Sequence, residues 1–332
     1  RNKNKKEDDR YLPLLWRILL NTSSRYNSLK EINEACAEIY DPSYTIRTIE
    51  SGRENIVGLS GTFTNEKYTE KGMNEKNIKF LSHFLFEPKI VDGGFDKKVF
   101  ETKKEKLIEF YSSIKDYPRD YADGRIEEEM ISLDYKNYSL DEMIEETRSL
   151  TNKELYEYYK KMMSEGVLDI FVCGNFDSED IKKIIDKNIS FKGKTSGDID
   201  HVFNQVKCNE KPNIVIEEAS NVQSNLIVGC KIINMNNHER QYEFTLYNWI
   251  LGGGMNSLLN RTIREENSLC YYIYASRKSL SGIMKIYAGI DAVNFDKTYD
   301  LIKEEMENIK KGNFDNELLE GVKKIYYNSL KS

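Results

Sequence analysis

The chain has 332 residues, of which 39% are hydrophobic and 31% are charged, so it can fill ordinary cores but is long for a single domain. Its 49 Lys and Arg residues against 55 Asp and Glu residues give a net charge of −6, and the two signs are interleaved, which excludes the basic footprint of a nucleic-acid-binding protein. No apolar run approaches the ~20 residues that span a bilayer, so we expect no membrane association.

The cysteines indicate the redox compartment. Five of them, an odd number, are scattered along the chain without a Cys-x-x-Cys pair (Cys36, Cys173, Cys208, Cys230 and Cys270). Such a set is typical of free thiols in a reducing compartment, so we expect a cytoplasmic protein. The sequence opens with Arg1 rather than Met, and it contains no visible secretion signal. We expect that segments of the protein lie beyond both ends of this sequence.

Hydrophobic periodicity and capping residues predict the elements of the first half. Leu12 to Leu20 is apolar on most helix faces, and Pro13 suits the first turn of a buried helix. Ser28 and Glu31 have the spacing of a capping box for a second helix. The expected elements are, in order, two helices (residues 11–20 and 28–39), two alternating strands (44–49 and 55–63), a helix that ends near Pro88, and a long helix (96–114).

The second half begins with an apolar run from Val167 to Gly174, which predicts a strand. Asp177 is placed to cap a short helix that ends near Ile185. The polar, glycine-containing residues 188–213 are interpreted as a linker between domains. Beyond it we expect a strand, a helix ended by three glycines, two strands and two helices (residues 222–230, 239–251, 270–276, 283–290, 295–310 and 315–330).

Two places in the sequence indicate an internal duplication. Phe95 and Phe314 each lie between a nearby glycine and an aspartate at the start of an expected helix, and they are 219 residues apart. Upstream, Gly61 and Gly289 lie in expected strands and are 228 residues apart. One duplication with a period near 220 residues explains both correspondences.

The most specific string in the chain is Leu-Gly-Gly-Gly at residues 251–254, followed by Arg264 and, seven positions later, by Tyr271. Taken alone, the glycines are interpreted as a helix C-cap, and the spacings of a phosphate-binding loop are absent. The string resembles the second-repeat signature of the insulinase, pitrilysin and mitochondrial processing peptidase family. The likeness extends over nearly the whole chain.

This resemblance implies an α+β fold of the LuxS/MPP-like metallohydrolase type. It consists of two homologous repeats, each an antiparallel sheet backed by helices, that face one another across a chamber for an extended peptide. We accordingly expect a first repeat in residues 1–187 that lacks its N-terminal part, a linker in 188–213, and a second repeat in 214–332 that lacks its C-terminal part.

Active members of the family carry a His-x-x-Glu-His motif on the first helix, in which the two His bind zinc and the Glu activates water. Aligned through the capping-box helix, these positions fall on Leu14, Arg17 and Ile18. Neither hydrocarbon side chain can bind zinc, and a guanidinium cannot take a proton from water. The position of the third ligand falls on Glu109 or Phe110. We therefore expect neither a metal nor another cofactor, and no catalytic residue.

Other candidates for chemistry are weaker. His83 and Glu87 are four residues apart on a helix and could meet on one face, but no further His or Cys is nearby, so we expect a surface pair at the helix end. His201, in the linker, and His238, in a polar loop, are expected to be solvated. Cys270 begins a strand and has no neighbouring His, which argues against a nucleophile.

The resemblance implies that Arg264 and Tyr271 point at the peptide backbone, where a guanidinium and a phenol can donate hydrogen bonds to a carbonyl or its oxyanion. Some bacterial members divide the zinc and the Arg/Tyr pair between two chains. We therefore expect a peptidase homologue without activity of its own, which binds peptides as the partner subunit of a zinc-bearing paralogue in a heterodimer, or which forms a homodimer. The alternative role of Arg264 is a surface salt bridge, for example with Glu265.

Two other functions remain open at this point. The first is a structural or binding protein with no role in proteolysis, which would show no peptide turnover with any partner. The second is a metallopeptidase with unconventional ligands such as His83, Glu87 and Glu109, which would hold stoichiometric zinc.

Overall fold

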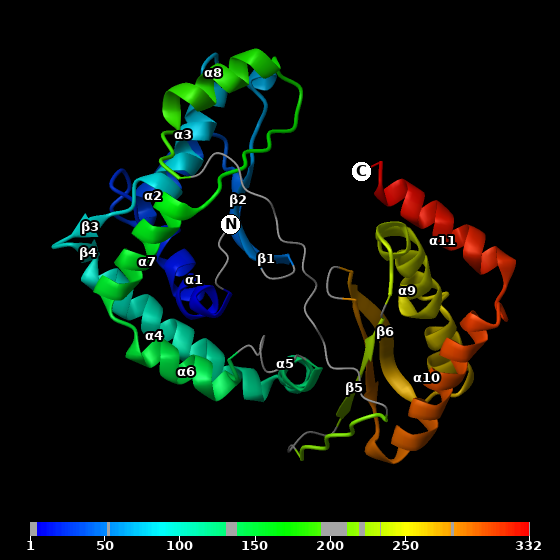
Figure 1. Ribbon diagram of the computed structural model, residues 1–332. Helices are drawn as coiled ribbons and strands as arrows, with labels where there is room; N and C mark the ends of the chain where they lie inside the picture. Colours follow the sequence, from blue (N-terminus) through cyan, green and yellow to red (C-terminus); the bar gives the residue numbers. More distant parts are fainter. Residues whose placement is uncertain are drawn as a thin grey trace. The chain divides into compact units, whose positions relative to one another are not determined.

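The computed structural model describes residues 5–51, 54–130, 138–193, 211–218, 223–232, 234–279 and 282–331. Its contacts divide the chain into two compact units, one of residues 1–112 and 138–202 and one of residues 113–137 and 203–332. Each unit has its own antiparallel strands and its own helices (Figure 1). The expected mixed fold of helices and antiparallel sheets is therefore confirmed.

In the first unit, helices α1 and α3 contact an antiparallel strand pair. The antiparallel pair β1 and β2 runs from Ser43 opposite Thr62 to Ser51 opposite Glu54. A short hairpin of β3 and β4 joins α3 to α4. The elements are α1 (Lys5–Leu19), α2 (Leu29–Glu38), β1 (Ser43–Ser51), β2 (Glu54–Thr62), α3 (Met73–Phe86), β3 (Ile90–Val91), β4 (Gly94–Phe95), α4 (Lys97–Ser113), α6 (Leu140–Ser149), α7 (Asn152–Glu165) and α8 (Ser178–Asn188).

Most local predictions for this unit are confirmed. The Ser28 side chain accepts the backbone N–H of Glu31 at 3.3 Å and begins α2. Both expected strands, the helix that ends before Pro88 and the long helix α4 are present. The core between these elements contains Phe80 and Phe84, and the Tyr44 ring stacks on Phe84 with centroids 5.3 Å apart.

Helix α1 differs from the prediction at its start. It begins at Lys5, so Pro13 lies inside the helix rather than in its first turn. An internal proline removes one backbone hydrogen bond from a helix. The burial of the apolar face compensates for this loss, because five side chains of α1 are almost completely removed from water (Leu12, Leu14, Leu15, Ile18 and Leu19).

The strand predicted from Val167 to Gly174 is wrong. Val167 forms an isolated bridge, and residues 168–173 belong to none of the strands that the structure describes. The side chain of Phe171 is 92% exposed. An apolar run of β-branched residues becomes a strand only where neighbouring backbone supplies its hydrogen bonds, which a local pattern cannot show. Of the expected linker, residues 194–210 lie outside the described residues.

The second unit is built on a three-stranded antiparallel sheet in the order β5-β7-β6. All the expected strands and helices beyond residue 222 are present, with a π-helical turn over Glu239–Glu243 leading into α9. The elements are α5 (Pro118–Met130), β5 (Ser224–Lys231), α9 (Phe244–Gly252), the π-helical turn η5 (Asn260–Glu266), β6 (Cys270–Lys278), β7 (Ile283–Ile290), the short η6 (Ala292–Asn294), α10 (Phe295–Lys310) and α11 (Asn316–Ser329).

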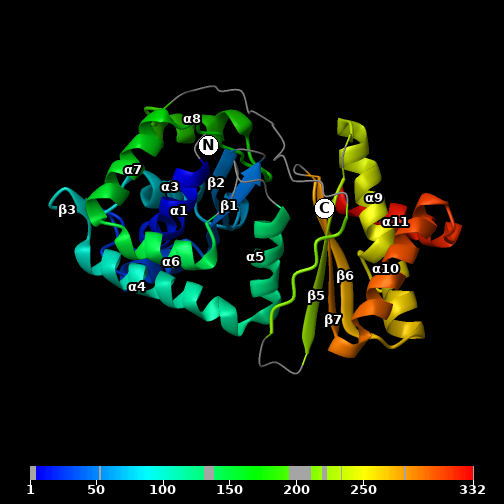
Figure 2. The ribbon, with the colours of Figure 1, turned by 60° about the horizontal axis from the view of Figure 1, so that its bottom comes forward.

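The two faces of this sheet are covered differently. Helices α9 and α10 pack on one face, with Leu251, Ile286 and Ile302 in the shared core. Helix α5 lies against the opposite face, next to β5 (Figure 2). Gly229 of β5 permits this approach, because a Cβ at this position would collide with the sulfur of Met130. The central strand β7 is buried along its whole length.

The compact units and the expected repeats have different boundaries because of helix α5. It belongs to the second unit, although α4 and α6, on either side of it in the sequence, lie mainly in the first. The expected first repeat of residues 1–187 and the first compact unit therefore do not cover the same stretch of chain. The physical reason is the packing of α5 on β5.

The two strand pairs β1/β2 and β6/β7 have equivalent positions in the order of elements. Tyr44 lies opposite Gly61 in the first pair, and Tyr272 lies opposite Gly289 in the second. Each residue of the second pair follows its counterpart by 228 positions. In both units a helix, a tight turn and another helix follow the strands. This correspondence supports the duplication that the sequence indicates.

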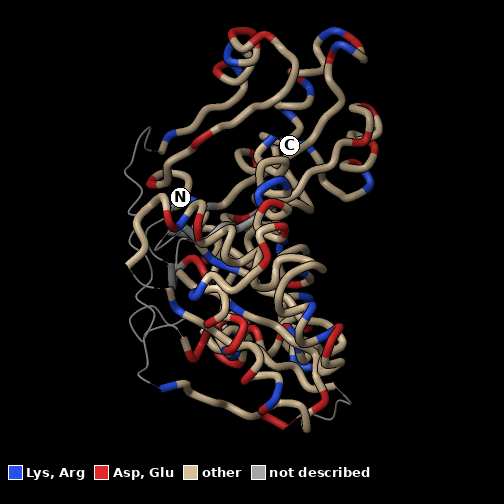
Figure 3. Tube along the Cα trace, turned by 90° about the vertical axis from the view of Figure 1, so that its right-hand side faces the viewer, with Lys and Arg blue, Asp and Glu red and all other residues tan. Residues whose placement is uncertain are grey.

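Charged residues of both signs are interspersed along the described chain. Lys and Arg residues alternate with Asp and Glu residues in both units (Figure 3). Many of them pair within one helix turn, as Lys323 does with Glu320 at 2.8 Å. No described helix has the length and hydropathy that a membrane span requires.

The end of α9 provides a test of this packing. A Cβ at Gly252 would lie 2.6 Å from the backbone nitrogen of Ala275, so we expect Gly252→Ala to lower the free energy of unfolding by about 1–3 kcal/mol. Gly321→Ala is the control, because Gly321 lies inside α11 with open space around it, and this change should stabilise by about 0.5–1 kcal/mol. Urea unfolding followed by circular dichroism measures both. Equal effects of the two changes would contradict the proposed contact.

Candidate functional site

The first of the three glycines at residues 252–254 brings helix α9 onto strand β6. Gly252 is the last residue of α9, and its backbone lies directly against Ala275. The capping residue, Gly253, has φ −85°, which any residue can adopt. Glycine is therefore needed here for close approach rather than for the left-handed conformation of a common C-cap.

The short π-helical turn η5 (Asn260–Glu266) carries Arg264. Its apolar side is fixed in the core by Leu259 and Ile263, which are fully buried. The hydroxyl of Thr262 donates to Glu305 of α10 at 2.6 Å. Arg264 lies on the exposed side of this turn. No residue within the described ranges forms a hydrogen bond or an ion pair with its guanidinium, so the alternative role of Arg264, a surface salt bridge, is not observed there.

A tight reversal connects Arg264 to β6. Ser268 has φ 52°, and its backbone N–H donates to the carbonyl of Arg264 at 3.1 Å. Leu269 donates in the same way to Ile263 at 3.0 Å. These bonds close the helical turn and direct the chain into the strand. Arg264 and Tyr271 thus lie on either side of a turn whose backbone is fixed.

Tyr271 lies at the start of β6, where the pairing with β7 is irregular. Its side chain is 60% exposed, and its hydroxyl donates to Oδ1 of Asp291 at 3.3 Å. The site therefore presents a guanidinium and a phenol from one rigid segment. Side chains of this kind form hydrogen bonds with the carbonyl and N–H groups of an extended peptide.

Cys270, the neighbour of Tyr271, is the first residue of β6, as expected. Burial raises the pKa of its thiol to about 11, against the opposing effect of the Arg264 charge. Because only the thiolate is nucleophilic, this thiol is chemically inert at neutral pH.

The positions aligned with the zinc motif lie on α1 in the first unit. Leu14 and Ile18 are buried in the core, and neither carries an atom that binds a metal. The guanidinium of Arg17 donates to the carbonyl of Pro13 at 2.9 Å and lies over the ring of Phe110, 5.5 Å from its centroid. Phe110 is one of the two residues predicted at the third-ligand position. Helix α4 therefore places that position beside α1, where it now meets a cation.

The pair of His83 and Glu87 is formed, with Nδ1 and Oε1 3.1 Å apart. The prediction of a surface pair is wrong for the imidazole, which is buried at the end of α3 next to the Tyr26 ring. Across the described part of the chain, no three His, Cys, Asp or Glu side chains come close enough to form a metal site. His201 and Cys208 lie outside the described residues.

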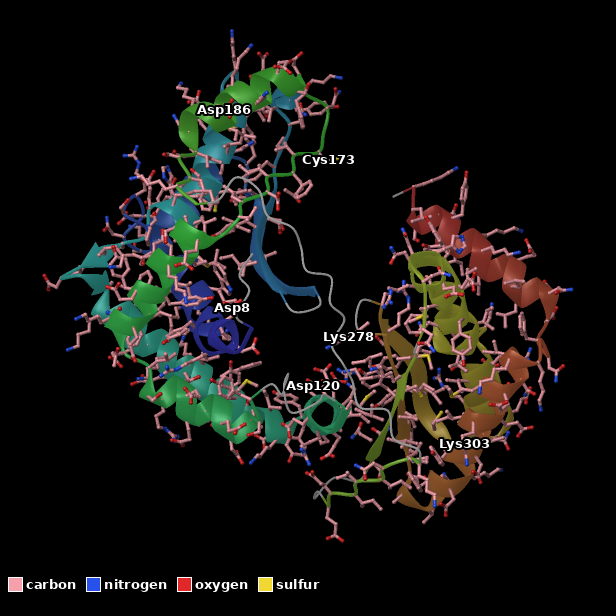
Figure 4. The ribbon with its side chains drawn as sticks, viewed as in Figure 1. Asp8, Asp120, Cys173, Asp186, Lys278 and Lys303 are labelled. Atoms are coloured by element: carbon pink, nitrogen blue, oxygen red, sulfur yellow. The ribbon has the colours of Figure 1, made fainter. Side chains whose placement is uncertain are left out.

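The sequence analysis missed a buried ionic cluster between α5 and the sheet. The side chain of Lys285 is only 5% exposed, and its Nζ lies 2.5 Å from Asp123 and 2.7 Å from Glu127. Glu127 also binds Lys278, which Figure 4 labels in the second unit. The Tyr287 hydroxyl donates to Asp123 at 2.5 Å. The available signal was a lysine in the middle of the apolar strand β7.

A polar cavity of about 190 Å³ adjoins this cluster. It lies within the second unit, between the N-terminal half of α5 and strands β6 and β7. Figure 4 labels Asp120, which is on α5. Its lining residues are Arg119, Asp120, Asp123, Tyr274, Ser276 and Tyr287.

The charges of the cluster stabilise one another. Burial alone would raise the pKa of Glu127, but the nearby ammonium groups of Lys278 and Lys285 outweigh it and lower that pKa below its ordinary value of 4.5. For Lys285, burial lowers the pKa and the two carboxylates raise it above 10.5. The contribution of Glu127 to stability is therefore complete above pH 4.5 and is lost as the pH falls through its depressed value.

We expect Glu127→Gln to reduce the free energy of unfolding by roughly 2 kcal/mol at neutral pH, because the buried ammonium group of Lys285 then keeps only the more exposed carboxylate of Asp123 as an anionic partner among the described residues. The difference from the wild type should shrink below pH 4.5, where Glu127 becomes protonated. Glu320→Gln, in an exposed ion pair of α11, is the matched control and should change stability by less than about 0.5 kcal/mol. Urea unfolding at neutral pH and below pH 4.5 measures the difference in stability between Glu127→Gln and the wild type. A difference that is independent of pH would refute the ionic role.

Comparison with known proteins adds the following findings. The family profile described as "Peptidase M16 inactive domain" matches residues 149–326, which is more than half of the chain. The sequence is 24% identical over 96% of this chain, and 74% of the relative, to "Probable inactive metalloprotease YmfF" of Bacillus subtilis. It is 28% identical over 86% of this chain and 69% of the relative to "Uncharacterized zinc protease YmxG" of the same organism.

Solved structures have the same fold. A conserved protein from Enterococcus faecalis superimposes with a TM-score of 0.78 at 24% identity, over 99% of this chain and 77% of that one. The peptidase M16 inactive domain from Pseudomonas fluorescens gives a TM-score of 0.72 at 14% identity, over 99% and 77% of the two chains. Pitrilysin gives 0.56 at 14% identity, over 93% of this chain and 33% of that chain.

Proposed function

Because the chain belongs to the peptidase M16 family, we propose that it is a catalytically silent member that binds peptides for a zinc-bearing paralogue. The family resemblance drawn from the Leu-Gly-Gly-Gly string is thereby confirmed. The silent role is supported by a relative along 96% of this chain that is named a probable inactive metalloprotease.

The proposal is supported by the side chains at the positions that we align with the zinc motif. Hydrocarbon side chains stand at two of its positions, Leu14 and Ile18, and they belong to the core of the first unit. At the position that we align with the general base, the guanidinium of Arg17 donates a hydrogen bond to the carbonyl of Pro13 and lies over the ring of Phe110. A cation at this place repels a metal ion and cannot accept a proton from water. The chain therefore needs another subunit to supply the metal and the base.

The second unit keeps what a peptide-binding partner needs. Arg264 and Tyr271 are exposed on a backbone fixed by packing and by hydrogen bonds. A guanidinium that no described residue engages is available to a peptide carbonyl or to the oxyanion that forms during hydrolysis. The pair thus fits the binding half of a divided active site.

We propose a heterodimer with a zinc-bearing paralogue as the working assembly. A homodimer would combine two chains of which both lack the zinc motif, so it would bind peptides without cleaving them. A cytoplasmic location is supported by the cysteines, since Cys36, Cys173, Cys230 and Cys270 are free thiols among the residues described.

Co-expression with a His-x-x-Glu-His paralogue tests the function. We expect peptide cleavage by the complex to fall roughly a hundredfold for Arg264→Ala, through loss of an oxyanion donor, and roughly tenfold for Tyr271→Phe, through loss of one hydrogen bond. Rates are measured with an internally quenched fluorescent peptide.

Two exposed residues of the same types serve as controls. Arg261 lies on the same helical turn as Arg264, and Tyr327 lies on α11. Arg261→Ala and Tyr327→Phe should leave the rate within about twofold, as expected for surface changes. Full activity of both the Arg264 and Tyr271 variants would exclude the proposed role.

A further inference from the structure

Tyr271 is the extra residue of a β-bulge. Cys270 lies opposite Ile290 and Tyr272 lies opposite Gly289, so Tyr271 has no residue opposite it on β7. A bulge redirects its extra side chain relative to the alternation of the strand. The exposed position of Tyr271 follows from this geometry.

The neighbouring residue Tyr272 holds the bulge in register. Its ring lies over Gly289, where any Cβ would collide with it, and its hydroxyl donates to Oδ1 of Asn225 at 2.7 Å. Since Asn225, Gly289 and Tyr272 belong to β5, β7 and β6, this contact crosses all three strands. The direction of Tyr271 is thus fixed by the sheet rather than by a loop.

Asp291 directly follows β7 and faces Tyr271. It stands at the N-cap position of η6, where an Asp side chain commonly caps the helix. Its carboxylate makes no capping hydrogen bond. Within the described residues, its side-chain hydrogen bond is the one that it accepts from Tyr271 at 3.3 Å. The carboxylate of Asp291 therefore accepts a hydrogen bond from the phenol of Tyr271 and does not cap the helix.

This bond determines what Tyr271 can offer to a ligand. An ionised carboxylate has no proton, so Tyr271 is the donor and Asp291 the acceptor. A phenol has a single proton, and once this is engaged the oxygen can only accept a further hydrogen bond. Arg264, by contrast, can only donate. The two side chains then have opposite polarity, as do the N–H and carbonyl groups of a peptide backbone.

We propose that Asp291 is a positioning residue that orients Tyr271 as an acceptor for a backbone N–H of the bound peptide, while Arg264 donates to a carbonyl. This inference rests on the proposed peptide-binding function and deepens it. It differs from the expectation that both side chains donate to one carbonyl, and it predicts that the pair recognises an extended backbone.

The test measures binding of fluorescein-labelled oxidised insulin B chain to the full chain by fluorescence anisotropy. Asp291→Ala should weaken binding roughly threefold to tenfold, the effect of one hydrogen bond. Asp291→Asn keeps an acceptor oxygen and should bind within about twofold of the wild type. In a Tyr271→Phe background, Asp291→Ala should have no further effect, because no phenol is left to orient.

A scan of the same peptide with single N-methyl groups identifies the accepted N–H. At one position the N-methyl penalty should be present in the wild type and absent in Tyr271→Phe. If no position shows this dependence, or if Asp291→Ala weakens binding equally in both backgrounds, the positioning role is overturned. If Asp291→Ala binds the peptide as tightly as the wild type while Arg264→Ala binds it weakly, this inference is overturned but the proposed function is not. Absence of wild-type binding would overturn the proposed function and this inference together.

Discussion

Burial of Leu14 and Ile18 in the core of the first unit is the constraint on which the functional interpretation depends. A side chain at these positions stabilises the unit by being apolar, and burying each one contributes about 1.5–3 kcal/mol. A zinc ligand at the same place would have to be an imidazole or a carboxylate, whose polar atoms need partners when buried. Stability thus favours apolar side chains at these positions of α1, whereas metal binding requires polar ones. This chain has the apolar side chains.

In the second unit, the polar residues Arg264 and Tyr271 are exposed, and packing and hydrogen bonds fix the backbone that carries them. Gly252 brings α9 against β6, Thr262 connects η5 to α10, and Tyr272 braces the bulge across the sheet. These contacts connect η5 and β6, which carry Arg264 and Tyr271, to α9, α10 and β5. A site whose backbone is fixed in this way loses little entropy on binding a ligand.

Elements with strong local signals could be predicted from the sequence. The cap at Ser28, the alternating strands β1 and β2, and the helices after Asp96 and Asp315 are examples, because their determinants lie within a few residues of one another. The start of α1 was missed because a charged segment followed by Pro13 reads as a loop before a helix. The capping boxes at Ser139 and Thr151 are local signals of the same kind for α6 and α7.

The remaining features depend on contacts between distant parts of the chain. Helix α5 has no clear hydrophobic stripe, and its partner Lys285 follows Asp123 by 162 residues, so no local pattern reveals the pair. The same holds for the hydrogen bond between Tyr271 and Asp291, which needs the register of two strands. For the candidate site, the sequence indicated Arg264 and Tyr271 through a family signature, whereas the bulge and the acceptor Asp291 required the structure.

The most direct test of the central claim is the metal content of the purified chain after equilibration with zinc and removal of free metal, measured by plasma mass spectrometry. Because Leu14, Arg17 and Ile18 occupy the positions that we align with the zinc motif, the account predicts far less than one zinc per chain, and the same low value after His83→Ala. One tightly held zinc per chain, lost in the His83→Ala variant, would contradict the account and favour a metallopeptidase with unconventional ligands.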